Sequence, residues 1–385
     1  MKFLYPKYDP GLPTVLCINS DQFNRDIVML QHWSTRYNWV AILDTHLTET
    51  QAPWMPERLQ KQAVYVNESG PDVDAAWAKA RAYGHSILTE AKAKMPSLVA
   101  VMAGNWDYWN EECLRMACRD MGVPFLVLMR EHNLTPNRKE DAELYERCKS
   151  FPRVDGVAVA GDVTMDFITD LKLQPPEILR NTGFPRFDVW RIETPTEYED
   201  PVVLMSYRKG YGADAHFVEM LRRFSAAARR HPDVPFLVKA KHKPEIEMIE
   251  AMMPERPGNL KIVDALMLPR LVSNARAIVG FRSISLHECL LTGAPILIPS
   301  WGETAMDPTL LAPSPNDARL RGFMDFFTDP AEFERALDKA ASAPRSVAVD
   351  MAGHHALFAQ YFRHSPTELA TVRVENFVAE FAGPR

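Results

Sequence analysis

The sequence predicts an α/β protein made of two doubly wound, Rossmann-like domains, each with a parallel sheet. Short apolar runs alternate with amphipathic helical segments along most of the 385 residues. Such continuous runs are typical of parallel strands that are buried on both faces and joined by crossover helices. Proline and charged residues crowd the stretch 184–201, which divides the pattern into two series. We therefore expect one domain at 1–190 and another at 191–385.

The first series contains buried apolar runs that lack the alternation of a half-exposed strand. These expected strands lie at 14–19, 39–43, 64–66, 98–102, 124–129 and 156–160. The segment 73–94 has apolar residues three and four positions apart, including Ala76, Ala80 and Tyr83, which predicts an amphipathic helix. Further helices are expected at 109–121 and 138–149.

The second series repeats this pattern. Its expected strands lie at 202–206, 235–239, 260–263, 277–280 and 295–299, and its expected helices at 214–230, 266–273 and 284–292. No apolar run of this kind follows residue 315, so we expect the strands to stop there and closing helices to complete the second domain. Two such domains would face each other across a cleft, with ligands at the carboxyl ends of the strands.

Composition and charge exclude several classes of protein. The 44 basic and 50 acidic side chains give a net charge of -6 without a basic domain, which argues against a nucleic-acid partner. The five cysteines are scattered and contain no CxxC pair, and neither HExxH nor a D-x-D after a strand occurs, so we expect no metal. The N-terminus has no signal-peptide core, which predicts a cytoplasmic protein. Peripheral contact with the inner face of the membrane stays open.

A polar turn follows the strand expected at 277–280 and leads directly into a helix. A helix N-terminus attracts phosphate through its free N–H groups and its dipole. Arg282 adds positive charge there, and Ser283 and Ser285 add hydroxyl donors. Glu288, on the first turn, is suited to accept hydrogen bonds from two ribose hydroxyls. The alternative is a capping box, Ser285-x-x-Glu288, that serves only the helix.

Two further basic segments follow predicted strands. The run 239–243 has the densest positive charge in the chain, and Lys241 and His242 are its candidates for contact with a diphosphate or phosphodiester. Arg208 and Lys209 stand in a glycine-containing turn, where the backbone could approach a pyrophosphate. A solvated basic turn in the first case and a plain flexible turn in the second are the alternatives.

Three segments carry a family resemblance. The segment 279–299 resembles the donor-nucleotide motif of GT-B glycosyltransferases and related non-hydrolysing sugar-nucleotide 2-epimerases, in which a Glu-bearing helix precedes G-x-P and a strand. The segment 181–188 resembles the G-N-P-x-x-D segment that closes their N-terminal domain, with Phe184 in place of the Asn. The segment 237–244 is similar to their K-x-H-P strand end, with Lys243 inserted before the proline.

The resemblance implies a GT-B fold in which the domain 1–190 binds an acceptor and the domain 191–385 binds a nucleotide-sugar. It implies a metal-independent glycosyltransferase that moves a sugar from a UDP- or CMP-activated donor to a hydroxyl of a glycan or lipid-linked acceptor. Such a reaction belongs to surface polysaccharide or glycolipid synthesis. The nucleotide-sugar would be a co-substrate, with no separate cofactor. His242 is similar to the phosphate-contacting histidine of the family.

A transferase needs a base near the acceptor hydroxyl or a carboxylate opposite the departing nucleotide. Asp107 and Glu131 suit that role because they follow predicted strands, and Glu131 occupies a place similar to a catalytic glutamate of the epimerases. His132 is the alternative base. A helix cap or a turn ion pair is the structural alternative for each. A 2-epimerase, a polyol-phosphate transferase and a sugar-binding protein without turnover are the alternative functions.

Overall fold

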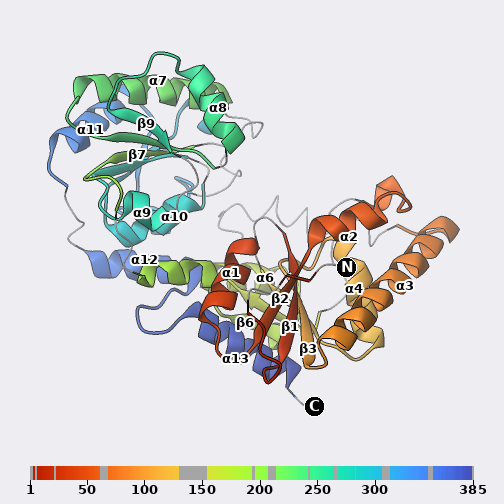
Figure 1. Ribbon diagram of the computed structural model, residues 1–385. Coiled ribbons are helices and arrows are strands. Elements are labelled where there is room, and N and C mark those ends of the chain that lie inside the picture. Colours follow the sequence, from red (N-terminus) through yellow and green to blue (C-terminus); the bar gives the residue numbers. More distant parts are fainter. Residues whose placement is uncertain are drawn as a thin grey trace. The chain divides into compact units, whose positions relative to one another are not determined.

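The computed structural model describes most of the chain in two compact units (Figure 1). The described residues up to Arg191, together with those from Ala359 onward, form unit 1, and those from Ile192 to Phe358 form unit 2. The described ranges are 3–4, 7–20, 23–60, 68–129, 154–192, 196–206, 214–241, 243–263, 268–281, 283–305, 313–345 and 350–383. The strand expected at 64–66 and the helix expected at 138–149 lie outside these ranges.

Unit 1 contains a six-stranded sheet with the order β2-β1-β3-β4-β5-β6, in which all neighbours are parallel. The strands are β1 (Thr14–Asn19), β2 (Asn38–Leu43), β3 (Leu98–Ala103), β4 (Phe125–Leu128), β5 (Gly156–Val159) and β6 (Leu179–Asn181). Every residue of β4 and β5 is buried, as expected of strands covered on both faces.

Helices cover both faces of this sheet, with α1 and α13 on one side and α3 and α4 on the other (Figure 1). The helices of the unit are α1 (Asn24–Trp33), α2 (Asp44–Gln51), α3 (Pro71–Lys94), α4 (Glu112–Asp120), α6 (Asp162–Asp170) and α13 (Ala370–Ala382). Four short 3-10 helices, η1 (Glu57–Leu59), η3 (Trp109–Glu111), η4 (Pro176–Ile178) and η5 (Pro185–Arg191), complete its described part. A Cβ built on Gly84 of α3 would lie 2.0 Å from the Cys113 carbonyl oxygen, so α3 and α4 cross in backbone contact.

Unit 2 contains a second six-stranded parallel sheet, with the order β12-β11-β10-β7-β8-β9. Its strands are β7 (Val202–Met205), β8 (Phe236–Lys239), β9 (Leu260–Val263), β10 (Ala277–Val279), β11 (Ile296–Pro299) and β12 (Asp325–Phe327). The helices are α7 (Asp214–Arg230), α8 (Lys243–Met252), α9 (Leu268–Val272), α10 (Ser285–Glu288), α11 (Pro330–Ser342) and α12 (Met351–Phe362), the last of which ends in unit 1. The short 3-10 helices here are η6 (Cys289–Thr292), η7 (Gly302–Thr304) and η8 (Ala318–Leu320). The predicted α/β class with two parallel sheets is confirmed.

The expectation that strands stop after residue 315 was wrong. β12 lies beyond that point and pairs in parallel with β11, and β6 was also not predicted. Both strands are three residues long and lie at a sheet edge. An edge strand needs fewer apolar residues than a central strand, because it has a neighbour on one side only.

The last part of the chain packs on unit 1, whereas the expected range 191–385 placed it with the second domain. A Cβ built on Gly161, after β5, would lie 2.2 Å from the Tyr361 carbonyl oxygen, so the returning chain lies against this strand end. The buried Asp188 carboxylate accepts hydrogen bonds from the N–H groups of Ala370 and Thr371, at 2.8 and 2.9 Å. These contacts fix the start of α13 on unit 1.

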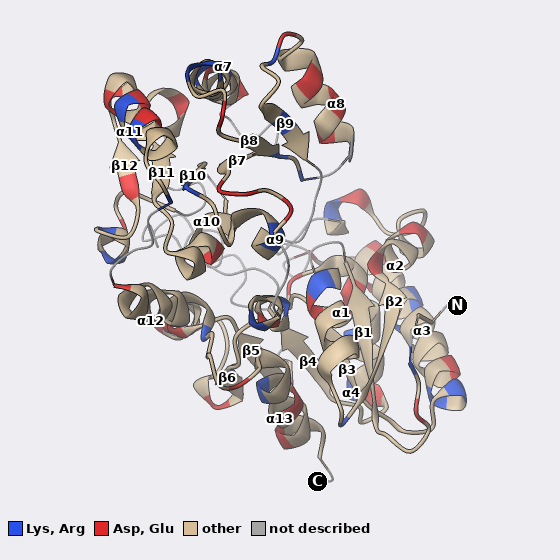
Figure 2. Cartoon of the chain, turned by 60° about the vertical axis from the view of Figure 1, so that its left-hand side comes forward, with Lys and Arg blue, Asp and Glu red and all other residues tan. Residues whose placement is uncertain are grey.

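Acidic and basic residues are mixed along outer helices such as α3 and α11 (Figure 2). Among the helices in the described ranges, none combines the length and the apolar character that a membrane crossing requires.

Candidate functional sites

Each sheet has one point at which the strand order reverses. In unit 1, β1 lies between β2 and β3, and in unit 2, β7 lies between β10 and β8. In open α/β sheets, ligands bind outside the carboxyl ends of the strands at such a point. Asp107 follows β3 in unit 1, and the turn that contains Ser283 follows β10 in unit 2. Predicted residues therefore lie at the reversal point of both sheets.

The turn after β10 is compact and enters α10 directly. A Cβ built on Gly280 would lie 3.1 Å from the Met205 Cβ, so the ends of β10 and β7 approach closely there. The Ser283 hydroxyl oxygen accepts a hydrogen bond from the N–H of Ser285 at 3.3 Å. Within these described residues the alternative capping box is not formed: α10 begins at Ser285 itself, preceded by Ile284, and no side chain caps it.

Glu288 is buried at the end of α10. Its exposed fraction is 7%. Burial raises the pKa of the neighbouring Cys289 thiol well above its ordinary value, the Glu288 carboxylate raises it further, and Lys239 lowers it. The carboxylate and the Lys239 ammonium therefore act on the same thiol. Lys239 is the last residue of β8, at the same edge of the sheet.

The backbone after β8 is held in place by the first turn of α8. The buried Glu245 carboxylate accepts a hydrogen bond from the N–H of Lys241, whose side chain is exposed. This contact holds the backbone at Lys241 and leaves the Glu245 carboxylate engaged with it. Within the described residues, the predicted candidates Lys241, Ser283, Ser285 and Glu288 thus all follow the carboxyl ends of β8 and β10.

Six predicted site residues lie outside the described residues, and the structure places none of them. They are Glu131, His132, Arg208, Lys209, His242 and Arg282.

Asp107 lies in a buried acidic environment after β3. Its exposed fraction is 4%, and that of nearby Glu111 is 2%. The pKa of Glu111 is raised well above its ordinary value, mainly by burial. The positive charge of Arg115 opposes this shift, and the negative charges of Asp107 and Asp44 add to it. One Glu111 carboxyl oxygen, Oε2, has no hydrogen-bond partner among the described residues. A carboxyl with a raised pKa is suited to act as a general acid.

Helix α2 holds the segment that carries these carboxyls. Gln51 Nε2 donates to the Asn110 carbonyl oxygen at 2.8 Å, and Asn110 Nδ2 donates to Thr48 Oγ1 at 2.9 Å. Glu111 was not predicted from the sequence, because only its burial distinguishes it from an ordinary residue before a helix. Its position four residues after Asp107 was the one available signal.

In the described part of the chain, no group of three His, Cys, Asp or Glu side chains could hold a metal ion. The predicted candidates described in the two units carry hydroxyl, ammonium and carboxylate groups. Such groups can bind phosphate and sugar hydroxyls and can transfer protons.

Comparison with known proteins finds similarity in structure alone. No family model matches the sequence, and no curated protein matches it. A putative UDP-N-acetylglucosamine 2-epimerase from Listeria monocytogenes superposes with a TM-score of 0.56 at 10% identity, over 97% of this chain and 98% of that one. The UDP-GlcNAc 2-epimerase from Neisseria meningitidis bound to UDP-GlcNAc gives 0.52 at 11% identity, over 96% and 99%. A calicheamicin glycosyltransferase gives 0.52 at 12% identity, over 97% and 100%.

These similarities extend over nearly the whole length of each chain and include both epimerases and glycosyltransferases. At such identities they establish the fold. The predicted resemblance is confirmed at that level: the chain has the two-domain, Rossmann-like GT-B fold.

Proposed function

We propose that this protein is a sugar-nucleotide enzyme, and specifically a metal-independent glycosyltransferase. The observation that carries the proposal is the buried Glu288 carboxylate after β10, at the reversal point of the second sheet, with Lys239 at the carboxyl end of β8 in the same sheet. A carboxylate and positive charge at one edge of a sheet suit a nucleotide, whose ribose offers two hydroxyls and whose phosphates are anionic.

In this proposal unit 2 binds the donor, a UDP- or CMP-sugar. Glu288 accepts hydrogen bonds from the ribose hydroxyls. The Ser283 hydroxyl oxygen already accepts the Ser285 N–H, so its own O–H can donate to a phosphate oxygen. Lys241 and Ser285 add further donors. Positive charge from Arg208, Lys209, His242 and Arg282 completes the proposed phosphate site.

Unit 1 binds the acceptor, a glycan or a lipid-linked glycan, which would bring the enzyme to the inner face of the membrane. Asp107 is the proposed base for the acceptor hydroxyl, and Glu131 or His132, which follow β4 in the sequence, are the alternatives. Burial and the charge of Asp107 and Asp44 raise the pKa of Glu111, so it holds its proton more tightly than an ordinary glutamate. In this proposal Glu111 is the proton donor of the two carboxyls.

The test is donor binding and turnover with purified protein. We expect one of UDP-, CMP- or GDP-sugars to bind saturably in isothermal titration calorimetry and to release its nucleotide when an acceptor is added. Glu288→Gln should weaken nucleotide binding at least tenfold with an unchanged melting temperature. Glu332→Gln, an exposed carboxylate on α11 of the same unit, is the matched control. Absence of binding by all three nucleotides contradicts the proposal.

The second candidate is a non-hydrolysing 2-epimerase. The paired carboxyls Asp107 and Glu111 favour it, because a change of configuration at a sugar carbon needs one group to take a proton and another to give one. Two similar structures are a putative UDP-N-acetylglucosamine 2-epimerase and a UDP-GlcNAc 2-epimerase. Incubation of UDP-GlcNAc without an acceptor distinguishes the two functions. An epimerase converts the sugar under these conditions, whereas a glycosyltransferase needs an acceptor to turn over.

A further inference from the structure

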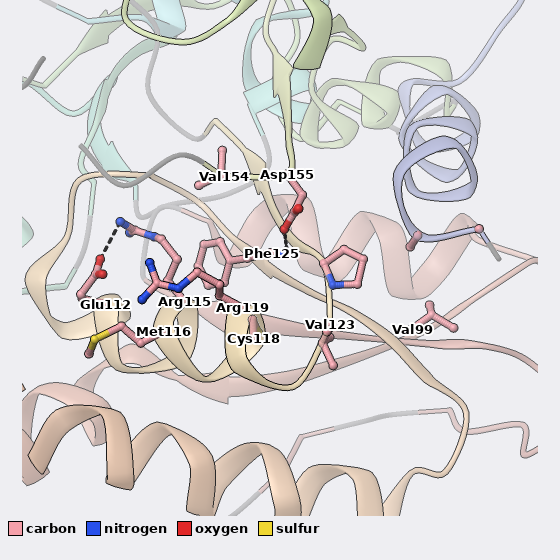
Figure 3. A pocket seen from close by; sticks show the side chains of 14 residues that line it. Val99, Glu112, Arg115, Met116, Cys118, Arg119, Val123, Phe125, Val154 and Asp155 are labelled. Carbon is pink, nitrogen blue, oxygen red and sulfur yellow. Dashed lines mark hydrogen bonds and ion pairs between the residues drawn. The ribbon is translucent and has the colours of Figure 1, made fainter. Parts of the chain in front are cut away.

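A cavity of about 530 Å³ lies in unit 1 beside α4, and we call it the α4 pocket (Figure 3). Val99 lines it near the start of β3, Phe125 lines it at the start of β4, and Asp155 lines it just before β5. These positions belong to the amino edge of the sheet, whereas Asp107 follows the carboxyl end of β3. The pocket is therefore separate from the proposed acceptor site, and its volume is within the ~300–1,000 Å³ usual for small-molecule sites.

A buried arginine forms part of the wall of the α4 pocket. The Arg115 side chain is 4% exposed, and its Nη1 lies 2.7 Å from the Glu112 carboxylate, the ion pair drawn in Figure 3. Its guanidinium carbon lies 5.3 Å from the centre of the Phe125 ring. Burial of a guanidinium is unfavourable without such partners. The two contacts hold a flat cation and a flat ring in fixed positions at the wall.

A second arginine gives the α4 pocket available positive charge. Arg119 lines the pocket one helical turn beyond Arg115 and is exposed. In the described ranges its side chain forms no ion pair or hydrogen bond. The two carboxylates of the pocket are engaged, since Glu112 pairs with Arg115 and Asp155 Oδ2 accepts the Phe125 N–H at 2.9 Å. An anion that enters the pocket can therefore pair with Arg119.

The rest of the wall is largely apolar and includes Met116, Val123 and Phe125. We propose that the α4 pocket binds a small organic anion with a flat apolar body. Its carboxylate, sulfonate or phosphate group pairs with Arg119, and its ring packs against the apolar side chains. This inference does not depend on the proposed function, because no residue of the α4 pocket belongs to either proposed substrate site.

Calorimetry with naphthoate, naphthamide and inorganic phosphate tests the proposal. Naphthoate has both the ring and the charge, naphthamide has only the ring, and phosphate has only the charge. We expect naphthoate to bind at one site per chain and at least tenfold more tightly than the other two probes.

Arg119→Gln should weaken naphthoate binding about tenfold, since it removes the proposed ion pair. Arg335→Gln is the matched control, because this side chain on α11 of unit 2 is 70% exposed and far from the pocket in the sequence. Both variants change an exposed side chain and should keep the melting temperature of the unaltered protein. Equal naphthoate affinity of Arg119→Gln and the unaltered protein overturns the proposal, as does equal binding of naphthamide or no saturable binding of naphthoate.

Discussion

The crossing of α3 and α4 gives the sharpest prediction about the fold, through the substitution Gly84→Ala. Helix propensity alone favours alanine over glycine by about 1 kcal/mol inside a helix. The structure predicts the opposite sign. The new Cβ would lie 2.0 Å from the Cys113 carbonyl oxygen, whereas ordinary contact begins at 3.4 Å, and the obstructing atom is backbone that cannot rotate away.

Inserting a methyl group into a packed site costs about 1–3 kcal/mol, and we take the upper end because two backbones must separate. After the propensity gain, we expect Gly84→Ala to lower the free energy of unfolding by about 2 kcal/mol. For a unit of this size the melting temperature should fall by about 4–8 °C.

Thermal melts followed by far-UV circular dichroism measure this shift. Gly258→Ala is the matched control, because a Cβ there meets no atom within 4 Å, so its melting temperature should stay nearly unchanged. Hydrogen exchange should also rise in α3 and α4 of the Gly84→Ala variant, and stay unchanged in unit 2. If Gly84→Ala is as stable as the unaltered protein, the close crossing of these helices is refuted.

Substitutions at three further positions test other buried or paired groups. In urea titrations, Glu111→Gln should become increasingly stable relative to the unaltered protein as pH rises above 4.5. The reason is that a raised folded-state pKa gives the unaltered protein stability that is lost when Glu111 ionises. A difference in unfolding free energy that does not change with pH contradicts this. Glu375→Ala should cost about 3 kcal/mol and Glu375→Gln less, since Glu375 accepts three hydrogen bonds from residues 34–36, and equal costs argue against these bonds. The pKa of Asp120 is lowered by its hydrogen bond with Arg81. The unaltered protein should therefore be more stable than Asp120→Asn above pH 3.8, and this advantage should disappear as pH falls. If the advantage persists in acid, the ion pair is not its cause.

The central strands could be predicted from the sequence because each is a continuous apolar run. A strand such as β4 is buried on both faces, so every side chain must be apolar. The apolar run in the sequence therefore shows where the strand lies. β6, with the sequence Leu-Arg-Asn, and β12, with Asp-Phe-Phe, carry polar residues at the sheet edges. They form because a neighbouring strand offers hydrogen bonds, and no local pattern predicts that.

The return of the chain to unit 1 could not be predicted for a similar reason. It depends on contacts between residues distant in the sequence, such as Asp188 with the start of α13. The glycine that permits close approach, Gly161, looks like any turn glycine in the sequence. Segment order alone therefore favoured one domain from 191 to the end. Tertiary packing instead assigns the residues from Ala359 onward to unit 1.

The candidate sites show the same division between local and tertiary information. Polar residues after predicted strands indicated Asp107, Lys241 and the turn before Glu288 as candidates, because parallel strands bring their carboxyl ends to one edge. Their roles stay a prediction. The sequence does not give the order of strands in a sheet, so it could not show that two of these positions lie where that order reverses. Nor could it show that Glu111 is buried, since part of its environment, such as Asp44 at the start of α2, is distant in the sequence. The chemistry proposed for unit 1 therefore depends on tertiary structure more than that of unit 2, where one local segment supplies the turn, the hydroxyls and the carboxylate.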